Sequence, residues 1–135
     1  MAKTLVLLKP LRANQDVALL ILRLTAISPM FLKHGIENIF TFSGMPALVI
    51  AMISDSFCTI LMILGLVTRW AAAITFLNLF IAWAFVHHFH FFAPENDHGE
   101  LIVIYLGVTL TLFFSGPGRY SLDAQLHRPS DESAT

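Results

Sequence analysis

Two fully charged side chains, Arg23 and Asp55, stand deep inside long apolar stretches of the sequence. A charge near the middle of a bilayer costs a few kcal/mol or more unless it is paired or hydrated, so such residues are functional candidates. At about 1.5 Å per residue along antiparallel helices, both fall in the middle third of the membrane and could meet. An open guanidinium–carboxylate pair would bind a polar headgroup, such as a quinone carbonyl, or relay a proton. A closed pair would only fix the helix register.

A histidine extends this polar set toward one surface. His34 follows Arg23 by eleven residues, which is about 20° around an ideal helix, so the two side chains are expected on one face. Pro29 lies between them and disturbs the helix. Histidine exchanges protons near neutral pH, which suits proton-coupled quinol chemistry. We therefore predict that Arg23, His34 and Asp55 line one catalytic, quinone-binding pocket.

A second candidate site lies where the third apolar stretch ends in WAFVHHFHFF. Imidazole with thioether suits copper, and imidazole with carboxylate suits zinc. An alternative is that these histidines are simply hydrated within the aromatic belt of a membrane interface. The predicted metal ligands, for copper or zinc, are His87, His90, His98 and Glu100.

The composition supports a membrane protein. Of the 135 residues, 56% are hydrophobic and 13% charged, against about 25% charged in an ordinary globular domain, and the mean hydropathy is +0.73. A net charge of -1 without a basic run argues against nucleic-acid binding. The single cysteine, Cys58, excludes an intrachain disulfide scaffold and a CxxC redox motif. No haem, flavin or iron–sulfur motif is evident, so a redox role would need electrons from a partner.

The elements that must position these residues are four apolar helices. A spanning helix needs about 20 mostly apolar residues, so four nearly exhaust the chain. We expect an all-α, transmembrane four-helix bundle of up-down-up-down topology. Residues 17–118 form this domain, between an N-terminal arm, 1–16, and a C-terminal tail, 119–135. The predicted spans are 17–34, 46–67, 70–92 and 99–115.

Positive charge predicts the orientation of this bundle. Lysine and arginine near span ends favour the cytoplasmic side, and only Lys33 falls on the side opposite the termini. Both termini are therefore expected to be cytoplasmic, in a multi-pass membrane protein. The basic residues on the side of the termini are Lys3, Lys9, Arg12, Arg69, Arg119 and Arg128.

Three segments, LRLTAISPMFLKHGIENI, ILGLVTRWAAA and FSGPGRYSLD, together resemble the DoxX family of small four-helix bacterial inner-membrane proteins. The resemblance covers roughly Ala18 to Asp123. It places the family's arginine on Arg23, its His-Gly pair on His34 and Gly35, and its usual glutamate on Asp55. The family's acidic residue opening the fourth helix would be Glu100. Here an aspartate stands in place of the glutamate, which shortens the reach of the carboxylate.

The resemblance implies a redox association, without a single reaction. Relatives include membrane subunits associated with thiosulfate oxidation by quinone, others grouped with superoxide-defence and sulfur-transfer proteins, and others encoded beside copper-binding peptide systems. The leading hypothesis is an accessory subunit of a respiratory or sulfur-oxidising oxidoreductase that interacts with quinone and is not active alone.

Two other functions remain open at this point. One is non-enzymatic copper or zinc handling at the outer histidines, and the other is a structural subunit that stabilises a larger membrane complex. The expected partners are the lipid bilayer and a larger membrane oxidoreductase or another membrane subunit. Small residues such as Gly107 also permit close helix packing, including self-association into a homo-oligomer.

Overall fold

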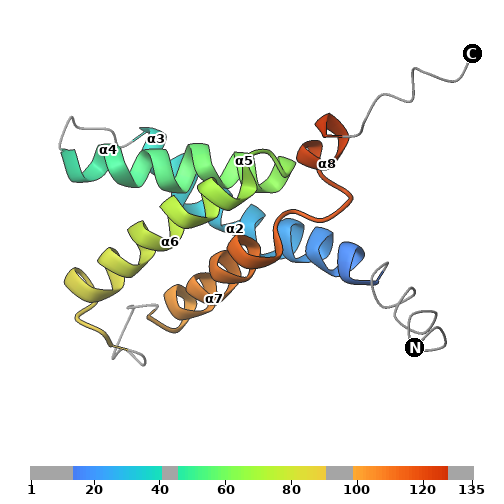
Figure 1. Ribbon diagram of the computed structural model, residues 1–135. Coiled ribbons are helices and arrows are strands. Elements are labelled where there is room, and N and C mark those ends of the chain that lie inside the picture. Colours follow the sequence, from blue (N-terminus) through green and yellow to red (C-terminus); the bar gives the residue numbers. More distant parts are fainter. Residues whose placement is uncertain (1–13, 41–45, 91–98, 128–135) are drawn as a thin grey trace, which may run out of the picture.

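The computed structural model describes residues 14–40, 46–90 and 99–127 (Figure 1). These residues form helices joined by turns, and no strand occurs among them. The prediction of an all-α protein is therefore confirmed.

The first helix, Asn14–Phe40, is one continuous helical segment that changes its hydrogen-bond pattern several times. Pro29 has no N–H to donate to the carbonyl of Thr25, and π-helical turns lie on either side of it. After an α-helical start over residues 14–22, its parts are η1 (Arg23–Ile27), α2 (Ser28–Met30), η2 (Phe31–Gly35) and α3 (Ile36–Phe40).

The second helix also contains a π-helical segment. It consists of α4 (Pro46–Met52), η3 (Ile53–Cys58) and α5 (Thr59–Leu64). The Thr59 hydroxyl donates to the carbonyl oxygens of Asp55 and Ser56, so backbone acceptors within η3 are satisfied by a side chain.

A tight turn then leads to the remaining helices. Gly65 ends α5 in the left-handed region at φ 71, and Val67 follows at φ 48. The turn therefore lies at residues 65–67, just before the gap between the predicted spans 46–67 and 70–92. The helices that follow are α6 (Thr68–Phe85), α7 (Gly99–Ser115) and α8 (Leu122–Leu126).

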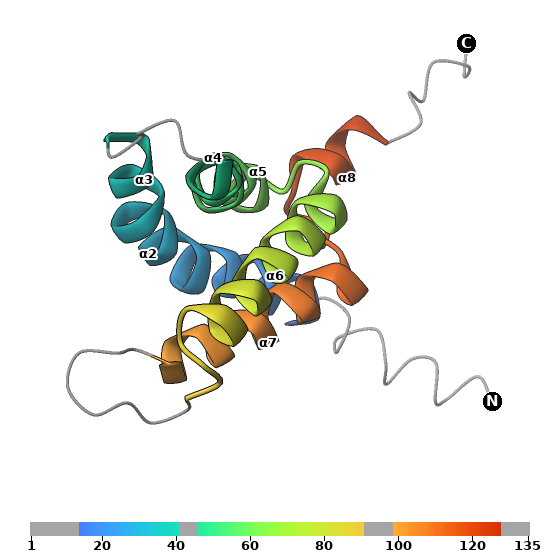
Figure 2. The same cartoon turned by 90° about the vertical axis from the view of Figure 1, so that its left-hand side faces the viewer.

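The helices form two layers that meet at one end and diverge toward the other (Figures 1 and 2). The first helix packs against the α4–η3–α5 helix, and α6 packs along α7. Successive helices run in alternating directions (Figure 1). Near the closed end, fully buried apolar side chains from all four long helices form the core: Ile27, Met62, Ala72 and Leu112.

Among the described residues, two helices, Asn14–Phe40 and Thr68–Phe85, are long and apolar enough to cross a membrane, and Val49–Leu64 and Gly99–Ser115 are shorter apolar helices. Only 17% and 28% of the apolar windows of the two long helices are buried within the protein. A core helix of a soluble protein would be mostly buried, so these exposed apolar surfaces suit contact with lipid. The third helix ends at Phe85, earlier than the predicted residue 92, because His88 and Phe89 adopt positive φ values of 47 and 59.

Candidate functional site

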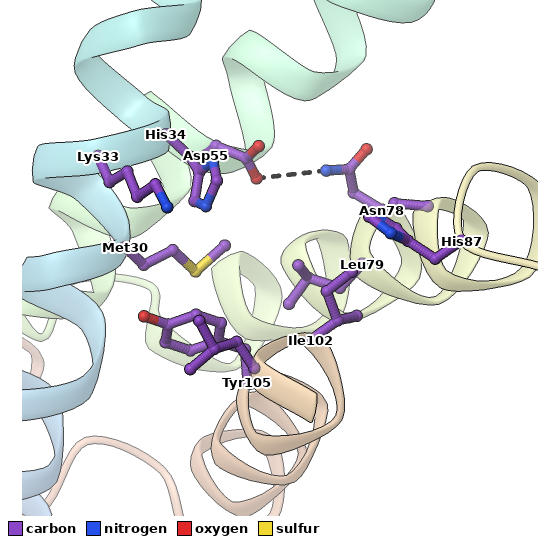
Figure 3. A pocket seen from close by; sticks show the side chains of 11 residues that line it. Met30, Lys33, His34, Asp55, Asn78, Leu79, His87, Ile102 and Tyr105 are labelled. Atoms are coloured by element: carbon purple, nitrogen blue, oxygen red, sulfur yellow. Dashed lines mark hydrogen bonds between the residues drawn. The ribbon is translucent and has the colours of Figure 1, made fainter. Parts of the chain in front are cut away.

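A cavity of about 220 Å³ lies where the two layers diverge (Figure 3). It has room for several water molecules, each of which occupies about 30 Å³ in the liquid. One part of its wall is polar, and the rest is aliphatic. The lining residues are Met30, Lys33, His34, Asp55, Asn78, Leu79, Ala82, His87, Leu101, Ile102 and Tyr105.

The polar wall is centred on Asp55, whose carboxylate accepts three hydrogen bonds. Asn38 Nδ2 donates to Oδ2 at 3.1 Å, and Ser54 Oγ donates to Oδ1 at 3.1 Å. Asn78 Nδ2 also donates to Oδ1, at 3.2 Å (Figure 3). The donors come from α3, η3 and α6. Both carboxylate oxygens are thereby satisfied and oriented, as a partly buried carboxylate requires.

His34 lies beside Asp55 and interacts with it electrostatically (Figure 3). Lys33 brings an ammonium group to the same cavity from the first helix, while Tyr105 brings a phenol from α7 on the other side. Proton-exchanging groups thus face an apolar wall that includes Leu79. This combination fits a small ring with polar substituents, because the ring packs on the aliphatic side and the substituents meet the polar one.

Gly35 explains how His34 and Asp55 come so close. A Cβ atom on Gly35 would lie 2.5 Å from the carbonyl oxygen of Asp55, and Ser56 Oγ donates to the Gly35 carbonyl at 2.6 Å. Only glycine permits this approach of two helix backbones. In the His-Gly pair, the histidine therefore faces the cavity and the glycine provides the helix contact.

Arg23 does not belong to this cavity, contrary to the expectation that it meets Asp55. Its side chain is 1% exposed, and its Nη2 donates to the Tyr120 carbonyl. Its Nη1 touches Gly65, which lies ten residues beyond Asp55, or about 15 Å along a helix. The prediction that Arg23 and His34 lie on one helix face assumed regular α-helical spacing. The π-helical turns η1 and η2 change the number of residues per turn, so the two side chains no longer align.

Arg23 instead belongs to a contact at the closed end of the bundle, which we call the clasp: Arg23, the turn Gly65–Thr68 and the segment Tyr120–Asp123. Asp123 acts electrostatically on Arg23. Its carboxylate accepts from the backbone N–H groups of Val67 at 2.9 Å and Thr68 at 3.2 Å, and its own N–H donates to the Gly65 carbonyl at 2.9 Å. The clasp therefore joins parts of the three sequence segments on which the family resemblance rests.

The predicted metal ligands are not assembled in the part of the chain that the structure describes. His98 lies outside the described residues, and no group of three His, Cys, Asp or Glu residues suited to a metal occurs within them. His87 lines the cavity, His90 follows the end of α6, and Glu100 lies in the first turn of α7. The four-residue metal site stays a prediction.

Asn78 and Tyr105 of the cavity, and Asn38, which donates to the Asp55 carboxylate, were not among the predicted site residues. Two of them carry a signal in the sequence. Asn78 is an uncharged polar residue inside an apolar span, where an unsatisfied amide is costly. Asn38 follows His34 by four residues and therefore shares its helix face. Tyr105 carries no comparable signal, because tyrosine is common in membrane helices near interfaces.

Comparison with known proteins gives a family and no described activity. The sequence model of the DoxX family matches residues 18–88. An uncharacterized protein of Haemophilus influenzae is 33% identical over 110 residues, which span 72% of this chain and 82% of that protein. No solved structure matches the chain significantly. The family match includes Arg23, His34 and Asp55 and ends before the Gly116–Asp123 segment.

Proposed function

The chain belongs to the DoxX family, and we propose that it is a multi-pass protein of the bacterial inner membrane that serves as an accessory subunit of a respiratory or sulfur-oxidising oxidoreductase. Its part is to hold a quinone headgroup in the cavity lined by His34 and Asp55. The observation that carries this proposal is the juxtaposition of Asp55, fixed by three hydrogen bonds, with His34 and an aliphatic wall.

The chemistry of a quinone matches both walls of the cavity. Interconversion of quinone and quinol moves two electrons and two protons. His34 and Asp55 accept or donate protons at the ring oxygens, and the ring itself packs against aliphatic side chains such as Leu79 and Ile102. The electrons pass to or from a partner subunit, which is why the chain acts as an accessory component.

The location of the cavity also supports this role. Both layers are apolar on their outer surfaces, and the cavity is lined by residues from both of them. The two layers diverge at this end (Figure 2). A lipid-soluble molecule reaches such a cleft from within the bilayer. We place the clasp and both termini on the cytoplasmic side, according to the distribution of lysine and arginine, so the cavity lies in the outer half of the membrane.

Quinone binding by purified protein in lipid nanodiscs tests the proposal. Asp55→Asn and His34→Gln are expected to weaken the binding of a short-chain ubiquinone or menaquinone at least tenfold, about 1.4 kcal/mol. Glu100→Gln is the matched control, because it removes a carboxylate that does not line the cavity and should leave binding unchanged. Wild-type affinity in both cavity variants would refute the proposed site.

A further inference from the structure

Two exposed arginines lie at the closed end of the bundle. Arg69 lies in the first turn of α6, and Arg119 lies in the segment between α7 and α8; both are exposed. No hydrogen bond or ion pair joins either guanidinium to another residue in the described part of the chain. These two cations take no part in the quinone cavity or in the clasp.

The two arginines are close enough to share a ligand. The Arg69 guanidinium lies over Gly116, with Nε 3.5 Å and Nη2 3.7 Å from the place where a Cβ would stand. Arg119 follows Gly116 by three residues, so their Cα atoms are at most about 11 Å apart. Since an arginine side chain extends several ångströms from its backbone, both guanidinium groups can reach one headgroup.

The neighbouring carboxylates are bound to backbone donors. Asp16 Oδ1 accepts from the backbone N–H of Arg119 at 2.9 Å, and both carboxylate oxygens of Asp123 accept from backbone N–H groups of Val67 and Thr68. Within the described residues, these acids make no ion pair with the guanidinium group of Arg69 or Arg119. The guanidinium N–H groups of both arginines therefore remain available to bind an anion.

The side chains around the arginines are aromatic and exposed. Trp70 is 73% exposed, Tyr120 57% and Phe114 71%. Such residues are typical of the level where lipid headgroups meet acyl chains. An anion that also offers apolar groups complements this surface better than a small soluble anion does.

We propose that Arg69 and Arg119 form a binding site for the phosphate of an anionic phospholipid in the cytoplasmic leaflet, with Trp70 and Tyr120 packing against its glycerol and upper acyl chain. The inference does not depend on quinone binding. Bidentate contact with phosphate oxygens is the geometry for which guanidinium groups are suited. A lipid bound here would rest against the first turn of α6 and the Gly116–Pro117–Gly118 turn, next to the clasp.

Native mass spectrometry of the full chain, released from nanodiscs that contain equal phosphatidylglycerol and phosphatidylcholine, tests this site. We expect preferential retention of phosphatidylglycerol. Arg69→Gln and Arg119→Gln should each reduce the ratio of anionic to neutral lipid about fivefold, and the double variant about twentyfold or more. Lys9→Gln is the matched control, since it removes one positive charge of the N-terminal arm, outside the proposed site, and should leave the ratio unchanged.

Size-exclusion elution and helical content establish whether the variants are folded. If the double variant does not fold, the lipid ratio of either single variant decides whether the site exists. Equal retention of the two lipids by the wild type, or an unchanged ratio in both single variants, would overturn the proposal. An equal loss in Lys9→Gln would also overturn it, because general charge would then explain the preference. Displacement of the lipid by millimolar inorganic phosphate would identify a soluble anion as the ligand instead.

Discussion

Replacement of Gly65 by alanine should open the clasp. Gly65 has φ 71, and a Cβ atom there would lie 2.2 Å from Arg23 Nη1 and 2.5 Å from Ser121 Cβ. Neither neighbour can move freely, because Arg23 is buried by the surrounding helices and the Ser121 side chain caps α8. The substitution therefore combines an unfavourable backbone conformation with a steric overlap.

The two effects can be estimated separately. A left-handed conformation costs a residue with a Cβ about 1–2 kcal/mol, and overpacking in a well-packed region costs about 1–3 kcal/mol. The sum is about 2–5 kcal/mol of unfolding free energy. For a chain of this size, about 3 kcal/mol corresponds to a fall of about 10 °C in Tm.

Thermal unfolding in detergent, followed by circular dichroism, measures this loss, and Gly107 supplies the control. No atom lies within 4 Å of a Cβ placed on Gly107, which is in the middle of α7. Gly107→Ala should therefore be neutral or stabilising by about 0.5–1 kcal/mol. Equal Tm values for Gly65→Ala and wild type would show that the clasp does not close as described.

Other substitutions test the contacts around the cavity and the clasp. Gly35→Ala should lower stability by about 1–3 kcal/mol and weaken quinone binding, because the added Cβ pushes against the Asp55 carbonyl. The Tm measures the loss of stability, and a binding titration measures the loss of affinity. Asn78→Leu should weaken quinone binding in the same titration, since it removes one donor to the Asp55 carboxylate. Asp123→Ala should lower Tm by the equivalent of about 1–2 kcal/mol, because the N–H groups at the start of α6 lose their acceptor.

The fold was largely predictable because apolar length and turn chemistry dominate this sequence. The apolar stretches predicted the helices, and the predicted end of the fourth span at residue 115 matches the end of α7. The second span was predicted to reach residue 67, whereas α5 ends at Leu64 because Gly65 adopts a left-handed conformation. The end of the third helix was not predictable, because the apolar and aromatic run continues past Phe85 while the backbone at His88 and Phe89 leaves the helical region. Apolar periodicity reports burial or lipid contact and does not mark that change.

The candidate site was predictable in part. Charged and imidazole groups in apolar segments pointed to Asp55 and His34, which the structure places in one cavity. Arg23 was assigned to the same pocket by counting residues along ideal helices. π turns in the first helix change that count, and the partners of Arg23 come from Tyr120–Asp123, almost a hundred residues away in sequence. Such a contact depends on how the chain end folds back, which helix spacing does not reveal.

The arrangement separates two tasks at opposite ends of one small bundle. The clasp holds the helix ends together through Arg23, Gly65 and Asp123. The other end is left divergent, and the cavity with His34 and Asp55 lies there. A stable closed end is what allows the polar cavity to remain open between helices that would otherwise pack together.

The central claim is that a quinone headgroup lies against His34 and Asp55, and photolabelling of native membranes tests it most directly. A photoreactive quinone should label peptides that contain Met30–His34 of the first helix and Leu101–Tyr105 of α7, and excess unmodified quinone should suppress the labelling. Asp55→Asn should reduce this labelling by the same factor by which the substitution weakens quinone binding. Labelling that excess quinone does not suppress, or that falls only on lipid-facing residues such as Phe114 and Trp70, would contradict the proposed site.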